Sequence, residues 1–269
     1  MKHRASAIQY AVILLFLSYM LFPIAATYIF SVATRWDRSI LPEGYTLEWY
    51  RTALQSSYFL SGLRNSMIMS LASVAVSLLV VVPTVYWVHA RLSEAKPLLE
   101  LLMILPFGIP GVVLALALVQ VFSFPPLARS PYLLVGATVV FSMPFMYRAV
   151  GNALTAIDVR GLTEAAQSLG AGTGSILTQV IVPSIFPGIM SGSLLVFATV
   201  FAEFTLAKLI TGAAFKTLPL LLVEYTRKNG YVAAALSVIS FTLAWVASLL
   251  ILWIGRTGRR SAQETLRSR

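Results

Sequence analysis

The most regular feature of the sequence is the alternation of long apolar runs with short polar connections. A helix needs about 20 mainly apolar residues to cross the hydrocarbon core of a bilayer. Six stretches reach this length, and we interpret each as a transmembrane helix. They cover residues 8–33, 63–88, 98–122, 132–153, 186–210 and 231–254.

Two of the polar connections are long enough to hold structure of their own. In the first, 34–62, apolar residues recur at helical spacing from Leu47 to Leu54, after Thr46 as a suitable N-cap. This pattern predicts a short amphipathic helix at the outer membrane interface. The second connection, 154–185, lies on the opposite side of the membrane and carries the most distinctive motif of the chain.

Composition supports a lipid environment. Of the 269 residues, 58% are hydrophobic and 11% are charged, whereas soluble domains carry about 25% charged residues. The mean hydropathy is +0.82. The formal net charge of +10 comes from short clusters between the apolar runs, which is typical of membrane flanks rather than of a nucleic-acid-binding face. The sequence therefore predicts an all-α membrane protein with six transmembrane helices.

Several kinds of active site are excluded by the residue types present. The chain has no cysteine, and its two histidines, His3 and His89, are too few for a histidine-rich metal site. An intramembrane aspartyl enzyme needs two aspartates within spans, but Asp37 and Asp158 both fall in connections. We therefore expect no catalytic residue, no metal and no cofactor.

The lysines and arginines favour one orientation. With both termini in the cytoplasm, the inner side holds eleven of the 20 lysines and arginines, mostly because of five arginines in the C-terminal tail. The first apolar run is longer than the ~7–15 residues of a signal peptide core. We expect it to remain as a helix and both termini to be cytoplasmic.

The inner connection contains the stretch EAAQSLGAGTG, which begins at Glu164. Leu162, Ala165, Ala166 and Leu169 fall at i, i+3, i+4 and i+7, on one face of a predicted helix, and Gly170 stands where helices commonly end. We expect a helix, a sharp turn and a second helix. This apolar face has no evident place to be buried within the chain, so we expect a partner to cover it.

A phosphate-binding loop is the main alternative suggested by the glycines. Such a loop needs G-x-x-x-x-G-K-[ST] and follows a strand, but the chain has no Gly-Lys pair and the glycines here follow a helix. Nucleotide binding by this stretch is therefore disfavoured.

The same stretch resembles a known family signature. EAA (164–166), three residues, Gly170, nine residues and VIVP (180–183) resemble the cytoplasmic motif of permease subunits in binding-protein-dependent ABC importers, with valines replacing the family's isoleucine and leucine. The resemblance extends over about residues 46–248, through RNSM (64–67), LPFGIPGVVLAL (105–116) and TLPLLL (217–222).

This resemblance implies a type I ABC importer permease fold in the bacterial inner membrane. It also implies a second permease subunit, a dimer of separate cytoplasmic ATPases and an external binding protein. The loop around Glu164 would be the coupling helix that docks on the ATPase. The other coupling residues would be Ala165, Ala166, Leu169 and Gly170. The alternative is a helical hairpin that only connects two spans.

The expected organisation follows from the spans and the resemblance. Residues 1–33 form the first helix with a short basic tail, and 34–62 the external loop. Residues 63–255 form a five-helix permease core that includes the coupling loop 154–185, and 256–269 form a basic cytoplasmic tail.

A small set of intramembrane residues suggests a pathway. Pro106, Gly108 and Pro110 make a straight third span implausible, and proline-freed carbonyls tend to line cavities. Met143, beside Pro144 in the fourth span, is a weaker candidate. Glu203 is the one acidic residue deep within a span and should face a cavity or a partner. Harmless kinks and a structural carboxylate are the alternatives, and Arg148 fits an interface anchor better.

The transported solute stays open at this point. The sequence resembles the subgroup that moves polyamines, iron(III), thiamine or aminoethylphosphonate, which differ in charge. A secondary transporter or channel that works without an ATPase is the alternative function, but the chain shows no internal repeat and few intramembrane ionisable residues.

Overall fold

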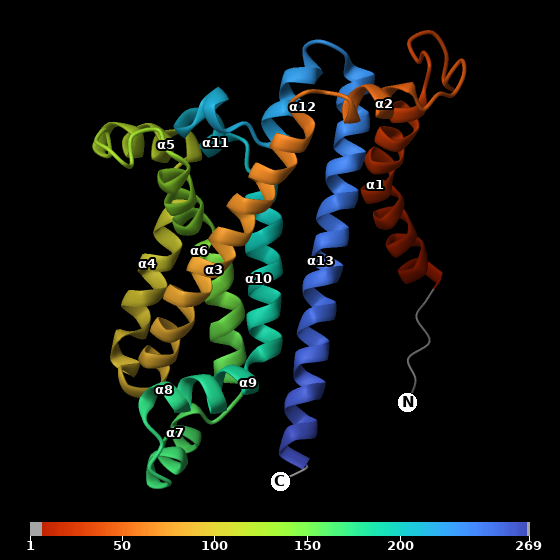
Figure 1. Cartoon of the computed structure of the whole chain (residues 1–269). Helices are drawn as coiled ribbons and strands as arrows, with labels where there is room; N and C mark the ends of the chain where they lie inside the picture. The colour runs from red at the N-terminus through yellow and green to blue at the C-terminus, as the bar shows by residue number, and fades with distance from the viewer. Residues whose placement is uncertain (1–6, 268–269) are drawn as a thin grey trace. The chain divides into compact units, whose positions relative to one another are not determined.

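The computed structural model describes the backbone of residues 7–267 and the side chains of residues 8–253. Lys2 and Arg4 of the expected N-terminal tail lie outside the described residues, as do the side chains of the C-terminal tail 256–269. Within the described part the chain is helical, with no named strand and one isolated β-bridge between Ala33 and Tyr45 (Figure 1). The predicted all-α fold is confirmed.

The described helices vary widely in length. The long ones are α1 (Ala7–Val32), α3 (Phe59–Arg91), α6 (Pro131–Thr155) and α13 (Gly230–Arg267). The others are α2 (Glu48–Leu54), η1 (Ser93–Ala95), α4 (Lys96–Gly108), α5 (Gly111–Val121), α7 (Val159–Ser168), α8 (Thr173–Ser175), the π-helix η2 (Ile176–Ile181), α9 (Val182–Ser184), α10 (Phe186–Phe201), α11 (Thr205–Ile210), η3 (Gly212–Phe215) and α12 (Leu218–Thr226).

The number of candidate membrane spans depends on two bent helix pairs. Four described helices are long and apolar enough to cross a membrane by themselves, namely α1, α3, α6 and the part of α13 up to Trp253. The pairs Ser93–Gly108 with Gly111–Val121 and Thr173–Ser184 with Phe186–Phe201 meet the criterion only together, with bends of 98° and 80°. The described residues thus hold four to six candidate spans.

The chain forms two compact units. The first unit comprises Met1–Leu60 and Leu221–Leu243, and the second comprises Ser61–Leu220 and Ala244–Arg269. In the first unit, the ring of Tyr231 stacks on Phe30 of α1 at a centroid distance of 4.5 Å and on Trp49 of α2 at 5.4 Å. The buried side chains of Ala53, Leu221, Val232 and Leu236 form its small core.

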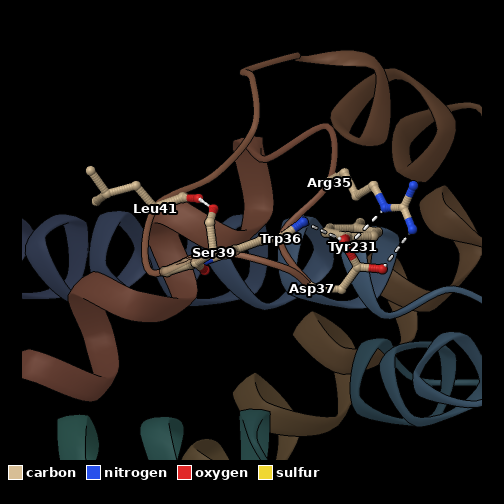
Figure 2. A network of polar contacts seen from close by, with 6 residues as sticks. All are labelled: Arg35, Trp36, Asp37, Ser39, Leu41 and Tyr231. Carbon is tan, nitrogen blue, oxygen red and sulfur yellow. Dashed lines mark hydrogen bonds and ion pairs between the residues drawn. The ribbon is translucent and has the colours of Figure 1, made fainter.

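The loop between α1 and α2 is held by polar contacts (Figure 2). The hydroxyl of Tyr231 accepts a 2.9 Å hydrogen bond from the backbone N–H of Trp36, and the guanidinium of Arg35 forms a 2.8 Å ion pair with Asp37. Thr46 Oγ1 accepts a 3.1 Å hydrogen bond from the N–H of Glu48, the first residue of α2. The short helix expected in this loop is therefore present, but it begins at Glu48 with Leu47 rather than Thr46 at the N-cap position.

In the second unit α6 lies at the centre of the core and α10 packs along it. Gly188 and Gly192 of α10 make this approach close. A Cβ atom on Gly188 would lie 2.4 Å from Cβ of Ala153 and 2.8 Å from the carbonyl oxygen of Ala149. Small residues four apart on both helices therefore let the two backbones come together, as is common between membrane helices.

A column of small polar residues marks the buried face of α3. Ser66, Ser70, Ser73 and Ser77 recur at helical spacing and are fully buried. The hydroxyl of Ser73 shares a 2.8 Å hydrogen bond with that of Thr138 on α6. Ser66 Oγ accepts a 2.9 Å hydrogen bond from the N–H of Leu218. Ser66 and Ser73 thus bond α3 to its neighbours, whereas Ser70 donates to the carbonyl of Ser66 within α3 and the hydroxyl of Ser77 has no partner among the described residues.

The third predicted span is sharply bent, as the sequence suggests. Helix α4 ends at Gly108, Ile109 is extended (φ −102°, ψ 118°), and Pro110 precedes the first turn of α5. A residue before proline is pushed out of the helical region by the proline ring. The two helices consequently meet at 98° (Figure 1).

The fifth predicted span, 186–210, is wrong as a continuous helix. Helix α10 ends at Phe201, and α11 begins at Thr205. Glu203 lies in the break, where its carboxylate Oε1 accepts a 2.8 Å hydrogen bond from the N–H of Leu206. A free N–H in the first turn of α11 is thus satisfied by a side chain that precedes the helix.

Candidate functional site

Helix α7, which holds the EAA stretch, begins with a side-chain cap. Asp158 Oδ1 accepts a 3.0 Å hydrogen bond from the N–H of Gly161, which satisfies one of the free donors at the helix start. A Cβ atom on Gly161 would lie 2.3 Å from Oδ2 of the same aspartate, so a glycine leaves room for the cap. Neither Asp158 nor Gly161 is among the site residues expected from the sequence, although an Asp before a periodic segment is a helix-start signal.

The end of α7 is equally well defined. Gly170 has a left-handed backbone (φ +80°). Its N–H donates to the carbonyl of Gln167 at 2.9 Å, and the N–H of Ala171 donates to the carbonyl of Ala166 at 3.0 Å. This pair of bonds is the Schellman motif, which favours glycine at the left-handed position. The predicted turn at Gly170 is therefore present.

The two faces of α7 differ from the expectation. Val159 and Thr163 are buried, and Leu162 and Ala166 pack against the core of the second unit. The expectation that this apolar face has no place to be buried within the chain is therefore wrong for Leu162 and Ala166, while Ala165 and Leu169 stay exposed. The buried face of α7 runs through Val159, Leu162, Thr163 and Ala166, so it is turned away from the predicted face, which included the exposed Ala165 and Leu169. A small alanine is compatible with either face.

The exposed face carries the rest of the motif. Glu164, Ala165, Gln167 and Ser168 are exposed, and Leu169 is 89% exposed. A leucine presented to this degree at a rigid helix end has no apolar contact of its own to make. Three of the five residues singled out by the resemblance thus face outward, namely Glu164, Ala165 and Leu169, while Gly170 shapes the turn.

Helix α7 is joined to the bundle by side-chain hydrogen bonds at its start. The hydroxyl of Tyr86 on α3 lies 3.3 Å from that of Thr163, and Arg160 Nη2 donates to Ser93 Oγ at 3.1 Å. Buried Ile176 and Ile181 belong to η2, which packs against α7. Helices α7, α8 and α9 lie together at one end of the second unit (Figure 1).

The structure separates the candidate pathway residues. Pro106 is buried in α4, whereas Gly108 and Pro110 are exposed at the bend. Met143, a residue of α6, is half-buried and packs against the core of the second unit. Glu203 is half-buried at the start of α11, which packs against α5. Within the described part Glu203 forms no ion pair with Lys208, and its backbone contact gives it a structural role whatever else it does.

No cluster suited to a metal occurs among the described residues, where three or more His, Cys, Asp or Glu side chains never converge.

Comparison with known proteins identifies the class of this chain. Residues 90–260 match the family described as binding-protein-dependent transport system inner membrane component. This match covers more than half of the chain and includes the whole of the EAA loop.

Individual relatives agree with the family. The chain is 26% identical over 178 residues to the spermidine/putrescine transport system permease protein PotC of Escherichia coli (strain K12), covering 66% of this chain and 67% of that one. It is 27% identical over 223 residues to the molybdate/tungstate transport system permease protein WtpB of Thermococcus kodakarensis, covering 82% and 88%.

A solved structure shows the same fold. A bacterial ABC transporter involved in the import of the acidic polysaccharide alginate contains a chain that matches with a TM-score of 0.69 at 16% identity, over 91% of this chain and 94% of that chain. The chain therefore belongs to the binding-protein-dependent inner membrane component family, and it is a multi-pass inner membrane permease of the type I ABC importer class.

Proposed function

We propose that this permease forms half of a translocation pathway and receives the force of a separate cytoplasmic ATPase through α7. The observation that carries the proposal is the division of α7 into two faces. One face is packed on the chain's own core, and the other presents Glu164, Ala165 and Leu169 outward. A helix that is capped at both ends and bonded to α3 can transmit a push as a rigid element.

The chemistry of the outward face fits docking in a cleft. Leu169 supplies an apolar anchor, Ala165 lets a partner backbone come close, and Glu164 offers a charge to a basic or polar group of the ATPase. The alternative, a hairpin that merely connects α6 to α10, gives no reason for an exposed leucine beside a rigid turn.

The remaining partners follow from the family. A second permease subunit, either a different chain or a second copy, would complete the pathway, and an external binding protein would deliver the solute. Each bent pair would then count as one span, which gives six spans with both termini cytoplasmic. The bend at Gly108 and Pro110, together with Met143 and Glu203, would face the pathway.

The solute class is a small polar molecule. The relatives are named for solutes of opposite charge, because spermidine and putrescine are cations and molybdate and tungstate are oxyanions. Polyamine, phosphonate, iron(III) and thiamine types therefore all remain within the proposal, and the binding protein would make most of the selection.

Uptake by the complete transporter in proteoliposomes tests this function. We expect Glu164→Lys to abolish ATP-driven uptake and ATPase binding while the permease is still inserted and folded. The same charge reversal at exposed Glu94 is the matched control and should leave both intact; Glu94 lies in the 3-10 helix η1, whose Ser93 accepts a hydrogen bond from Arg160 of α7. Normal uptake with Glu164→Lys would remove the coupling role.

A second arm separates the importer from a secondary transporter or channel. The permease pair, reconstituted without the ATPase, should move no solute down a gradient. Solute flux under these conditions would contradict the importer mechanism and favour the alternative.

A further inference from the structure

A polar cavity lies at the end of the second unit that carries α7. Its volume is about 310 Å³, and it is lined by α3, α4 and α6. Its lining includes side chains with ionisable or amide groups, namely His89, Lys96, Glu100, Tyr147, Arg148 and Asn152. Such a concentration is unusual in a chain with only 11% charged residues, so it calls for a reason beyond packing.

His89 leaves an unused polar atom at this cavity. Its Nδ1 lies 2.8 Å from the carbonyl oxygen of Val85, and because a carbonyl only accepts, Nδ1 carries the hydrogen. The other ring nitrogen, Nε2, is buried and has no hydrogen-bond partner in the described part of the chain. More than nine in ten buried polar groups are paired. Because Nδ1 carries the hydrogen, Nε2 of the neutral ring is an acceptor, and a bound group would satisfy it by donating a hydroxyl, such as that of a hydrogen phosphate or of a glycerol headgroup.

The charges around the cavity are predominantly positive. Lys96 and Arg148 both line it, and neither forms an ion pair within the described residues. The one carboxylate, that of Glu100, lies beside the hydroxyl of Tyr147. Tyr147 is a buried residue. Two cations thus face one carboxylate that already has a neighbour, and the balance favours an anionic guest.

The kind of anion follows from the donors. A guanidinium offers a planar fork that matches the oxygens of a phosphate-like group, and an ammonium adds a point charge. Asn152 can donate a further hydrogen bond from its amide. Simple interface anchoring would explain Lys96 and Arg148 singly, but it would not bring them to one cavity with the free nitrogen of His89.

We propose that this polar cavity binds a phosphate-like oxyanion group, with Arg148 and Lys96 as its charge partners. The group is either a free oxyanion or the headgroup of an anionic lipid. The site lies close to α7, since Thr155 at the end of α6 lines it and Tyr86, one turn before His89, contacts Thr163.

Binding by the purified full-length chain tests the site without any need for uptake. One arm uses nanodiscs of phosphatidylcholine and measures binding of inorganic phosphate and of molybdate by calorimetry. The other arm uses nanodiscs that contain phosphatidylglycerol and measures the lipid retained by native mass spectrometry. Binding in the first arm identifies a free oxyanion, and selective retention in the second identifies a lipid headgroup.

Four variants make the result specific. Arg148→Gln and Lys96→Gln should each weaken binding about tenfold or more, since a hydrogen bond to a charged group is lost. Glu100→Gln, which removes the opposing charge, should strengthen binding several-fold. Arg91→Gln is the matched control, because Arg91 lies over the ring of Trp87 at the same end of the unit and does not line the cavity.

The outcome that overturns the proposal is equally clear. If wild type binds neither phosphate, molybdate nor phosphatidylglycerol, or if the cavity variants behave like Arg91→Gln, Lys96 and Arg148 are interface anchors only. Should Arg148→Gln fold poorly, Glu100→Gln still decides, because unchanged binding in that variant contradicts the site. A failure here leaves uptake through α7 untouched, so the two proposals stand or fall separately.

Discussion

The hydroxyl of Tyr86 lies 3.3 Å from that of Thr163, and this contact joins the long helix α3 to α7. Thr163 Oγ1 already donates to the carbonyl of Val159 at 2.7 Å, so the tyrosine acts as the donor in the contact between the side chains. A displacement of α7 would therefore be felt directly by α3, which lines both the core and the polar cavity.

Removal of this contact should loosen coupling more than folding. We expect Tyr86→Phe to lower stability by about 1 kcal/mol, the usual net contribution of one hydrogen bond, and to lower uptake per ATP hydrolysed. The ratio of solute transported to ATP consumed is the measurement. Thr84→Val is the control, because the hydroxyl of Thr84 donates to the carbonyl of Val80 within α3. An unchanged ratio in Tyr86→Phe would show that α3 does not transmit the motion.

Gly170 should be sensitive to any side chain. Its φ of +80° is strained by roughly 1–2 kcal/mol for a residue with a Cβ atom, so Gly170→Ala should fray the end of α7 and reduce uptake. Gly170→Asn should be milder, since Asn tolerates the left-handed region. Hydrogen exchange of the Ala171 amide reports the fraying. Gly172→Ala, at an ordinary φ of −72°, should change neither, and equal losses in the two alanine variants would argue against the turn.

The contact between α10 and α6 gives the strongest expected effect on stability. Gly188→Ala inserts a methyl group into a space occupied by Ala149 and Ala153 and should destabilise the protein by about 1–3 kcal/mol. Gly136→Ala in α6 meets nothing within 4 Å and should be neutral or slightly stabilising. Thermal unfolding in detergent compares the two. Equal melting temperatures would mean that the helices are not this close.

The ion pair between Arg35 and Asp37, in the loop between α1 and α2, should resist acid. The hydrogen bond from Arg35 holds the pKa of Asp37 below its ordinary value of 3.8. Because the folded pKa is lowered, the stabilisation from this pair is present above the unfolded pKa and is lost only as the pH falls through the folded one. NMR titration of the Asp37 carboxyl checks this. In Arg35→Gln the pKa should rise toward the ordinary value, and no change would show that the pair does not form in solution.

Much of the helical framework was predictable because apolar length alone defines it. Helices α1, α3 and α6 begin and end within a few residues of the predicted spans. The turn at Gly170 was also predictable, since glycine after a periodic segment is a strong local signal. The hydrogen bond of Glu203 to the start of α11 was not predictable, because an acidic residue in an apolar run looks the same in the sequence whether it caps a helix or faces a solute.

Other features depend on contacts between distant parts of the chain. The rotation of α7 is set by Thr163 meeting Tyr86, a pair separated by 77 residues. The polar cavity brings together His89, Lys96 and Arg148, each of which looks like an ordinary flanking residue in its own segment. No local pattern marks these residues as neighbours.

The bend between α4 and α5 has an electrostatic consequence. A helix carries partial negative charge at its C-terminal end and partial positive charge at its N-terminal end. Since α4 ends at Gly108 and α5 begins at Gly111, both kinds of end lie three residues apart. The chain thereby presents opposite partial charges without an ionisable side chain, and any polar group that reaches the bend meets a field that does not vary with pH.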